Sequence, residues 1–142
     1  MIRHVAGIAE IVEDVEGAVR FYSEVLGLEV DHEAGSAYAV VKVPGVLHFG
    51  IWGRSAAAES VYGDPNAASR IPLGFSIGFE VDQVAKSQDE ISGSGWSFVQ
   101  TRREEPWGQV TSRYHSPSGA LGEISETPWA REIKTGMQVE GD

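Results

Sequence analysis

Apolar residues in the first third of the chain follow two different periods. Residues 5–12 are mostly β-branched or small and apolar, which is typical of a strand. Apolar residues then recur at intervals of three and four, the period of a helix, at Val15, Ala18, Val19, Tyr22, Val25 and Leu26. Asp14 stands where a helix N-cap is expected, and Gly27 stands where a left-handed residue ends a helix. Three more strands are predicted at 28–31, 37–43 and 46–52.

The same order of elements returns later in the chain. Residues 75–81 are predicted to form a strand, Asp82 to cap a helix, and residues 92–95 to end it. Further strands are predicted at 96–100, 110–115 and 120–125. Val81 follows Val12 by 69 positions and Val84 follows Val15 by the same interval. A nearly constant offset of this kind indicates an internal duplication.

The duplication predicts an α+β fold built from two tandem βαβββ modules, whose curved mixed sheets surround a shared cleft. One helix per module covers one sheet face and leaves the other open. We expect one domain over residues 1–126, with module one at 1–53, an irregular connector at 54–73 and module two at 74–126, followed by a C-terminal tail at 127–142. Spacing alone leaves open whether the modules pair within one chain or across a dimer.

Composition limits the class of protein. The chain has 142 residues, of which 42% are hydrophobic and 23% charged, as in a globular domain. No apolar run approaches the roughly 20 residues that cross a bilayer, so we expect no membrane association. The first residues lack the pattern of a secretory signal, which predicts a cytoplasmic location.

Charge and cysteine content exclude several kinds of chemistry. The chain has no cysteine, which excludes disulfides, thiolate metal sites and a cysteine nucleophile. Eleven Lys and Arg against 21 Asp and Glu give a net charge of −10, which opposes nucleic-acid binding. The acidic balance suits plain solubility, and it also suits attraction of a cationic small molecule.

Several segments resemble one known family. They are Asp14-Val-Glu-Gly-Ala-Val-Arg-Phe-Tyr22 with Val25-Leu-Gly-Leu28, Phe79-Glu-Val-Asp82, Glu105-Pro-Trp-Gly108, and Ser116-Pro-Ser-Gly-Ala-Leu-Gly-Glu123. In this order they resemble the vicinal oxygen chelate superfamily, which holds glyoxalase I, extradiol dioxygenases, methylmalonyl-CoA epimerase and the bleomycin resistance proteins. The resemblance implies the doubled βαβββ fold around a cleft.

The resemblance also implies where a divalent metal would bind. Metal-dependent members place ligands on the first and last strand of each module, and these positions correspond here to Gly7, His48, Ser76 and Glu123. Only His48 and Glu123 have side chains suited to a divalent ion. His4 and Glu10 are the substitutes on the first strand, but in a regular strand both point away from the face of Gly7.

Two enzymatic or binding functions follow from the resemblance. The favoured interpretation is a metal-free protein of the bleomycin resistance type, a homodimer that binds a small aromatic or cationic ligand through His48, Trp52, Trp107 and Glu123, with no cofactor. Pro106-Trp107-Gly108 would form either an aromatic lid beside the cleft or an aromatic anchor that fills the edge of the core. The alternative is a divalent-metal-dependent lyase, isomerase or dioxygenase with His48 and Glu123 as ligands, or with Glu123 as catalytic general base.

A third interpretation is a non-enzymatic accessory protein. The segment from Thr127 to Asp142 would then be an interaction segment, with Trp129 docking on a partner, although Lys134 to Asp142 is typical of a disordered end.

Overall fold

A computed structural model describes residues 1–129, in which eight strands form one mixed sheet. The first half contains β1 (Ile2–Val12), α1 (Val15–Arg20), a π-helical turn η1 (Phe21–Val25), β2 (Glu29–Asp31), β3 (Tyr38–Lys42) and β4 (Phe49–Gly53). It is followed by α2 (Arg54–Tyr62) and the 3-10 helix η2 (Pro65–Arg70). The second half contains β5 (Gly74–Val81), α3 (Val84–Gly93), β6 (Gln100–Glu104), β7 (Val110–His115) and β8 (Leu121–Glu126).

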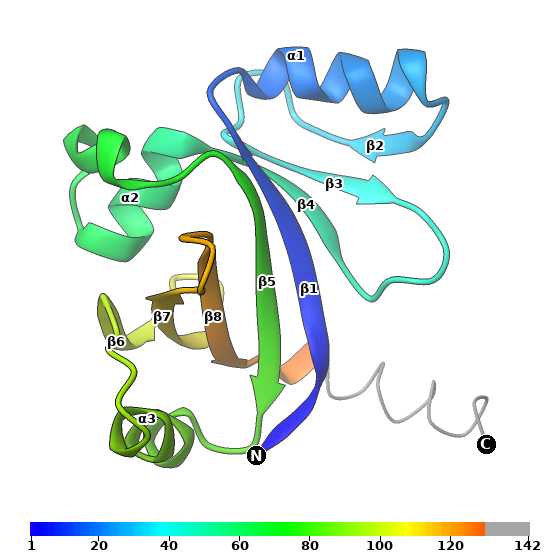
Figure 1. Ribbon diagram of the computed structural model, residues 1–142. Helices are drawn as coiled ribbons and strands as arrows, with labels where there is room; N and C mark the ends of the chain where they lie inside the picture. Colours follow the sequence, from blue (N-terminus) through cyan, green and yellow to red (C-terminus); the bar gives the residue numbers. More distant parts are fainter. Residues whose placement is uncertain (130–142) are drawn as a thin grey trace.

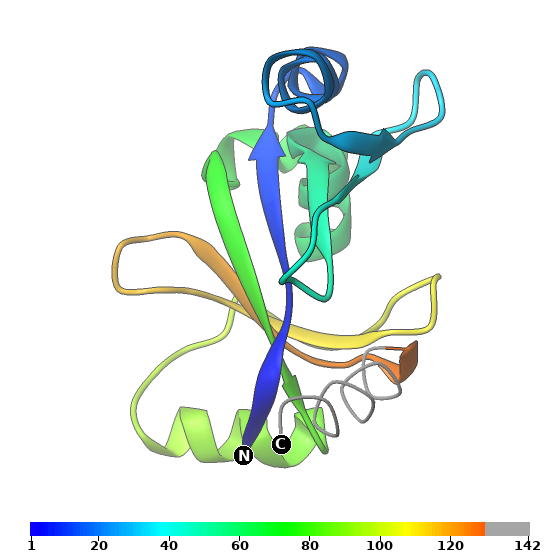
Figure 2. The ribbon, with the colours of Figure 1, turned by 90° about the vertical axis from the view of Figure 1, so that its right-hand side faces the viewer.

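The strand order confirms the duplication. The sheet runs β2-β3-β4-β1-β5-β8-β7-β6, so each half orders its strands in the same way outward from the centre. In each half the last strand runs parallel to the first, β4 beside β1 and β8 beside β5. Antiparallel pairing of β1 with β5 joins the halves within one chain (Figures 1 and 2). The expected α+β fold of two βαβββ modules is therefore correct.

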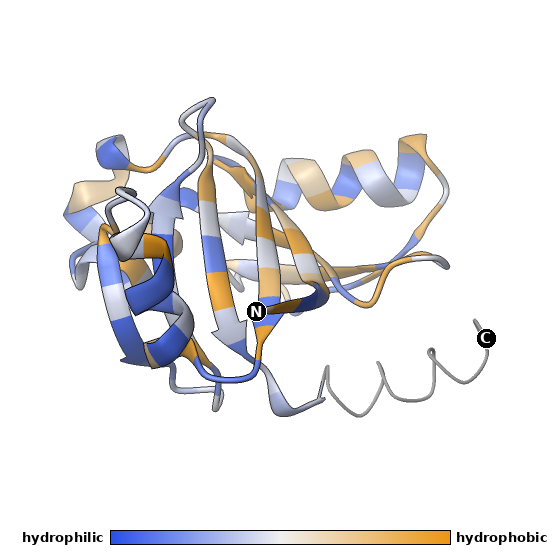
Figure 3. Cartoon of the chain, turned by 60° about the horizontal axis from the view of Figure 1, so that its bottom comes forward, coloured by the Kyte–Doolittle hydropathy of each residue, from blue (hydrophilic) through white to orange (hydrophobic). Residues whose placement is uncertain are grey.

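The two module helices lie at opposite ends of the molecule in both views (Figures 1 and 2). α1 packs its apolar side on a cluster of Tyr22, Ala39, Val41 and Ile51. α3 packs on Val81 and Ile124. Apolar and polar bands alternate along β1 and β5 (Figure 3), because successive side chains of a strand point to opposite faces.

The first helix begins and ends where its sequence predicts. The side chain of Asp14 accepts a hydrogen bond from the amide of Gly17, which satisfies one of the free N–H groups of the first turn. Gly27 has a φ of 71°, the left-handed conformation that suits glycine. The N-cap of α3, in contrast, is Gln83 and not the predicted Asp82, and the first amide of that helix, on Val84, donates to the carboxylate of Glu126 on β8.

The prediction of an irregular connector at 54–73 is wrong, because most of it is helical. Alanine and serine dominate Arg54–Tyr62, and alanine is the strongest helix former. Ala57 and Ala58 are fully buried and pack with Ile11 of β1 and Leu121 of β8. Helix α2 therefore covers one end of the sheet face that α1 and α3 leave open.

Two strand boundaries also differ from their predictions. The strand predicted at 96–100 lies instead at Gln100–Glu104, and the strand predicted at 46–52 begins only at Phe49. β6 is one of the two edge strands of the sheet, and most of its residues are polar and exposed. Its sequence consequently lacks the alternation that marks a strand with one buried face.

Within residues 1–129 there is no helix long and apolar enough to span a membrane. Of the predicted tail at 127–142, Thr127 is buried and its amide donates to Glu80, so the segment starts as part of the folded domain. The predicted disordered end, Lys134 to Asp142, lies outside the described residues.

The continuous sheet predicts that both halves unfold together. Ile51 and Ile124 are almost fully buried at equivalent places on β4 and β8, so Ile51→Ala and Ile124→Ala should each lower the free energy of unfolding by about 2–5 kcal/mol. Ile2→Ala, at a side chain that is 46% exposed, is the control and should cost much less. Urea unfolding followed by circular dichroism and tryptophan fluorescence should show one transition for every variant. Two transitions, with each variant shifting only one, would contradict a single cooperative unit.

Candidate functional site

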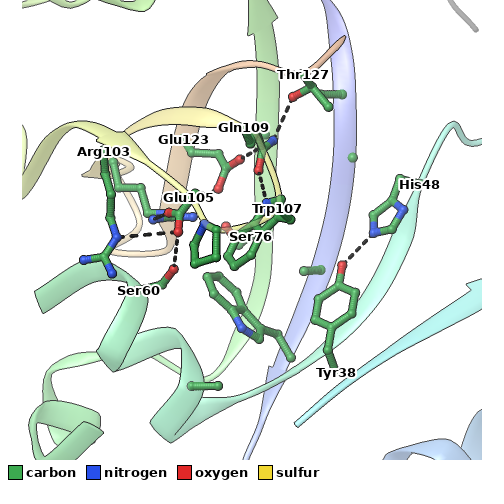
Figure 4. A pocket seen from close by; sticks show the side chains of 18 of the residues that line it. Tyr38, His48, Ser60, Ser76, Arg103, Glu105, Trp107, Gln109, Glu123 and Thr127 are labelled. Carbon is green, nitrogen blue, oxygen red and sulfur yellow. Dashed lines mark hydrogen bonds and ion pairs between the residues drawn. The ribbon is translucent and has the colours of Figure 1, made fainter. Parts of the chain in front are cut away.

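A cavity of about 740 Å³ lies on the open face of the sheet. Its floor comes from both halves, since residues of β1, β4, β5 and β8 line it. Helix α2 forms one wall, and the hairpin between β6 and β7 forms another (Figure 4). The space exists because the floor residues are small: Ala6, Gly7, Ala9, Ser76 and Gly78.

A buried ion network stands on the second-half side of the cavity. The Arg113 guanidinium contacts Glu105 through Nη1, at 2.7 Å, and Glu123 through Nε, at 3.1 Å. It also donates to the amide oxygen of Gln100 at 2.7 Å. Arg113 is 1% exposed, Glu105 is fully buried, and Glu123 is 15% exposed. Ion pairs of this kind persist only when their polar atoms are satisfied, and here both oxygens of each carboxylate and the Nε and Nη1 of Arg113 have partners.

Gln109 links the hairpin to this network. Its amide nitrogen donates to Glu123 at 3.4 Å and to the hydroxyl of Thr127 at 2.7 Å. Its amide oxygen accepts from the indole N–H of Trp107 at 3.0 Å. Trp107, which is 50% exposed at the hairpin tip, is therefore connected to Glu123 through one side chain (Figure 4).

The first-half side of the cavity is polar but uncharged. The Tyr38 hydroxyl lies 2.6 Å from Nε2 of His48, and the two rings stack with an interplanar angle of 9°. Burial lowers the pKa of His48. Burial, and then the negative charge of Glu123, raise the pKa of Tyr38. The phenol therefore keeps its proton, and its hydroxyl shares a hydrogen bond with Nε2 of a neutral imidazole.

The four predicted site residues all line this cavity, but they do not form one cluster. His48, Trp52, Trp107 and Glu123 are each part of its wall, while His4 and Glu10 are not. Figure 4 shows His48 and Glu123 separated by β1 and β5. Trp52 lies near the network instead, with its ring 5.4 Å from the Arg113 guanidinium carbon. Whether these residues bind a ligand stays a prediction.

The placement of His48 as the counterpart of Glu123 is wrong. Glu123 pairs with Gly78 on β5, and Gly78 follows Ala9 of β1 by the repeat interval of 69. Ala9 pairs with Gly50, so Gly50 is the equivalent position on β4. The Tyr38 ring fills the space above Gly50, where any side chain would collide with its hydroxyl.

The predicted orientation of Glu10 is correct. Its carboxylate accepts a hydrogen bond from the hydroxyl of Tyr22, which belongs to the cluster beneath α1 on the opposite face of the sheet. Glu10 therefore points away from the cavity and is not available to a ligand there.

Three important cavity residues were not singled out by sequence reasoning: Tyr38, Gln109 and Arg113. Arg113 carries a detectable signal. Ser116 and Ala120 close the hairpin between β7 and β8, and counting three residues outward on each side pairs Arg113 with Glu123. Gln109 and Tyr38 show no comparable signal, because their roles depend on contacts between distant segments.

The residues present do not fit a divalent metal of the kind that the resemblance implies. With the corrected register the four positions are Gly7, Gly50, Ser76 and Glu123, and only the last has a suitable donor. That donor is already paired with Arg113. Within the described part of the chain, no group of three or more His, Asp or Glu side chains is placed to hold a metal.

Comparison with known proteins gives a family match over nearly all of the described chain. A family model described as "Glyoxalase/Bleomycin resistance protein/Dioxygenase superfamily" matches residues 2–124. No curated protein sequence matches the chain.

Solved structures share the fold at low sequence identity. A methylmalonyl-CoA epimerase of Streptomyces coelicolor in complex with 2-nitronate-propionyl-CoA is 18% identical, with a TM-score of 0.63, over 89% of this chain and 96% of that one. The epimerase of Mycobacterium tuberculosis is 19% identical, with a TM-score of 0.61, over 88% of both chains. A superfamily member from Vibrio splendidus 12B01 is 16% identical, with a TM-score of 0.57, over 89% of this chain and 100% of that one. These likenesses show the fold alone.

The lowered pKa of His48 predicts a loss of stability in acid. The unfolded chain binds this proton below a pH of about 6.5, whereas the folded protein takes it up only at lower pH. The stability that His48 contributes is therefore complete above about pH 6.5 and is lost as the pH falls through the values below it. Thermal unfolding between pH 7.5 and 5.0 should show this decline, and His48→Gln should reduce it. An identical pH dependence in wild type and variant would show that His48 is not held neutral.

Proposed function

The chain belongs to the glyoxalase/bleomycin resistance protein/dioxygenase superfamily, and on this basis we propose that it is a binding protein whose cleft holds a small aromatic ligand with a cationic group, without a metal. The single observation that carries the proposal is the composition of the cavity wall. Aromatic side chains and small apolar residues line the cavity, and its charged residues are three carboxylates, Glu59, Glu105 and Glu123, against two arginines, Arg103 and Arg113.

The size and lining of the cavity support an aromatic ligand. About 740 Å³ is within the range of small-molecule sites. Trp52, Trp107 and Tyr38 supply ring surface, and Trp107 presents it at the mouth because it is half exposed. Aromatic pairs contribute about 0.5–1.5 kcal/mol beyond the burial of their area.

The charges at the site support a cationic group. Oε1 of Glu123 accepts a hydrogen bond from Arg113. Oε2 of Glu123 has only a long contact of 3.4 Å with the amide nitrogen of Gln109. A ligand ammonium or amidine that reached Oε2 would form a charge-assisted hydrogen bond in a partly buried place. The net charge of −10 would also raise the local concentration of cations around the protein.

The alternative, a metal-dependent lyase, isomerase or dioxygenase, has weaker support. It requires His48 and Glu123 at one ion, yet His48 bonds to Tyr38 and Glu123 bonds to Arg113. The accessory interpretation leaves a large aromatic cavity without a role. Trp129 lines this cavity, which supports a place for it in ligand binding rather than in docking to a partner.

We extend the proposal to a homodimer. The face of the sheet opposite the cavity exposes Phe75 (52%) and Ile77 (41%) on β5, next to the exposed Val5 of β1. Exposed apolar patches of this kind often mark protein interfaces. A cytoplasmic location also remains part of the proposal. In sedimentation equilibrium we expect a dimer that Ile77→Lys weakens, and a monomer at all concentrations would contradict this extension.

Ligand binding is tested with proflavine, a planar aromatic cation, and acridine-9-carboxylate as its anionic counterpart. Proflavine should quench tryptophan fluorescence on saturable binding, and the anion should bind much more weakly. Because Glu123→Gln removes a charged hydrogen bond worth about 1.5–3 kcal/mol, it should raise the Kd of proflavine roughly 10-fold to 100-fold. Trp107→Leu should weaken binding, while Trp96→Leu, at a similarly exposed indole outside the cavity, is the control.

Two results would overturn the proposal. One is proflavine binding that neither Glu123→Gln nor Trp107→Leu weakens more than the Trp96→Leu control. The other is elemental analysis of protein purified without chelator that finds about one divalent metal per chain, lost in His48→Ala or Glu123→Ala. That second result would favour the metal-dependent enzyme.

A further inference from the structure

We propose that Arg113 is the resident cation of an oxygen cage that would hold a divalent metal if the guanidinium were removed. The cage consists of Glu105, Glu123 and Gln100, which surround the Arg113 head group. This inference goes beyond ligand binding and does not depend on which molecule enters the cleft.

Oxygen atoms from β6, from the residue that follows it and from β8 converge on the guanidinium. Carboxylate oxygens of Glu105 and Glu123 lie 2.7 and 3.1 Å from its nitrogens, and the amide oxygen of Gln100 lies at 2.7 Å. Carboxylate and amide oxygens are the donors that hard divalent ions such as Mn²⁺, Mg²⁺ and Ca²⁺ prefer. The donor set around Arg113 is thus one that a metal could use.

The charge balance shows why the cage needs a cation. Two carboxylates, one fully buried and one 15% exposed, face a single buried guanidinium. Arg103 adds only a peripheral contact, with its Nε 3.5 Å from Glu105 and a side chain that is 36% exposed. Without Arg113 both carboxylates would lose their main counter-charge in a poorly solvated place, which is strongly unfavourable.

The cage is held together by more than Arg113. The Ser60 hydroxyl of α2 donates to Glu105 at 3.0 Å, and the Thr111 hydroxyl of β7 donates to it at 3.2 Å. Gln109 contacts Glu123 from the hairpin. These bonds should keep both carboxylates in place when the guanidinium is replaced by a smaller side chain.

The position of the cage explains the mismatch with a metal-dependent site. Glu123 is the only one of the four expected metal positions that retains a donor, and Arg113 is its direct cross-strand partner. A covalently attached cation therefore stands next to the position where the resemblance implies a metal ion. Since the guanidinium cannot be deprotonated or diffuse away, it excludes a metal from these oxygens.

The test compares Mn²⁺ binding to the full chain and its variants by isothermal titration and thermal shift. Wild type should show no saturable Mn²⁺ binding. Arg113→Ser should bind about one equivalent with a Kd of roughly 1 mM or tighter, and its Tm should rise with Mn²⁺ concentration. Arg113→Lys, which keeps the charge, and Arg102→Ser, at a neighbouring exposed arginine, are the matched controls and should behave as wild type.

Further variants locate the ion. Adding Glu123→Gln to Arg113→Ser should weaken Mn²⁺ binding at least tenfold. Adding Arg103→Gln should not weaken Mn²⁺ binding, because a guanidinium provides no ligand atom for the ion. Among the described residues, Arg103 is the only other cation that contacts the cage. If Arg113→Ser is unfolded in metal-free buffer, its circular dichroism is compared in Mn²⁺ and in Na⁺ at equal ionic strength. Folding of the variant in Mn²⁺ but not in Na⁺ supports the cage.

The inference is overturned by any of three results. These are saturable Mn²⁺ binding to wild type, binding to Arg113→Ser no tighter than to wild type, and no folding of Arg113→Ser in either salt. None of these measurements uses an aromatic ligand, so failure of the cage and failure of the proposed binding function can be told apart.

Discussion

The contact of Arg113 with Glu105 and Glu123 organises the functional side of this protein. A buried guanidinium requires opposite charges within hydrogen-bond distance, because an unpaired ion in a protein interior costs several kcal/mol. To satisfy it, the end of β6, the middle of β7 and the middle of β8 must keep a fixed register. Ser60 brings α2 into the same network through Glu105. One electrostatic requirement therefore fixes the relation of three strands and a helix around the cavity.

The duplicated fold supplies the space, and its two halves supply different chemistry. The residues where β1 pairs with β5 are small, so their side chains leave the volume of the cavity unfilled. The first half then contributes Tyr38 and His48, which are neutral and bonded to each other. The second half contributes charged groups and the hairpin that carries Trp107. A ligand in this cavity would meet an aromatic, uncharged side and a carboxylate side, which is the basis of the proposed specificity.

The overall fold was predictable from local signals, whereas the site was predictable only in part. Asp14, Gly27 and the interval of 69 residues mark the modules, because caps and repeats depend on short stretches of sequence. Helix α2 was missed because Ala, Ser and Gly also occur in loops, and its burial comes from Ile11 and Leu121 far away in the chain. Edge strand β6 was displaced because it has no buried face to produce alternation.

Candidate site residues show the same division. Glu123 and Trp107 were found because they belong to recognisable segments, while His48 was matched to the wrong position because β4 begins only at Phe49. The pairing of Arg113 with Glu123 could have been predicted by counting residues outward from the hairpin turn.

The most direct test of the account is a crystal structure of the protein with proflavine, grown in the presence of Mn²⁺. We expect the dye against Trp107 with its amine on Glu123 and with Arg113 still between the carboxylates. A metal ion on Glu123, with Arg113 displaced, would contradict the account.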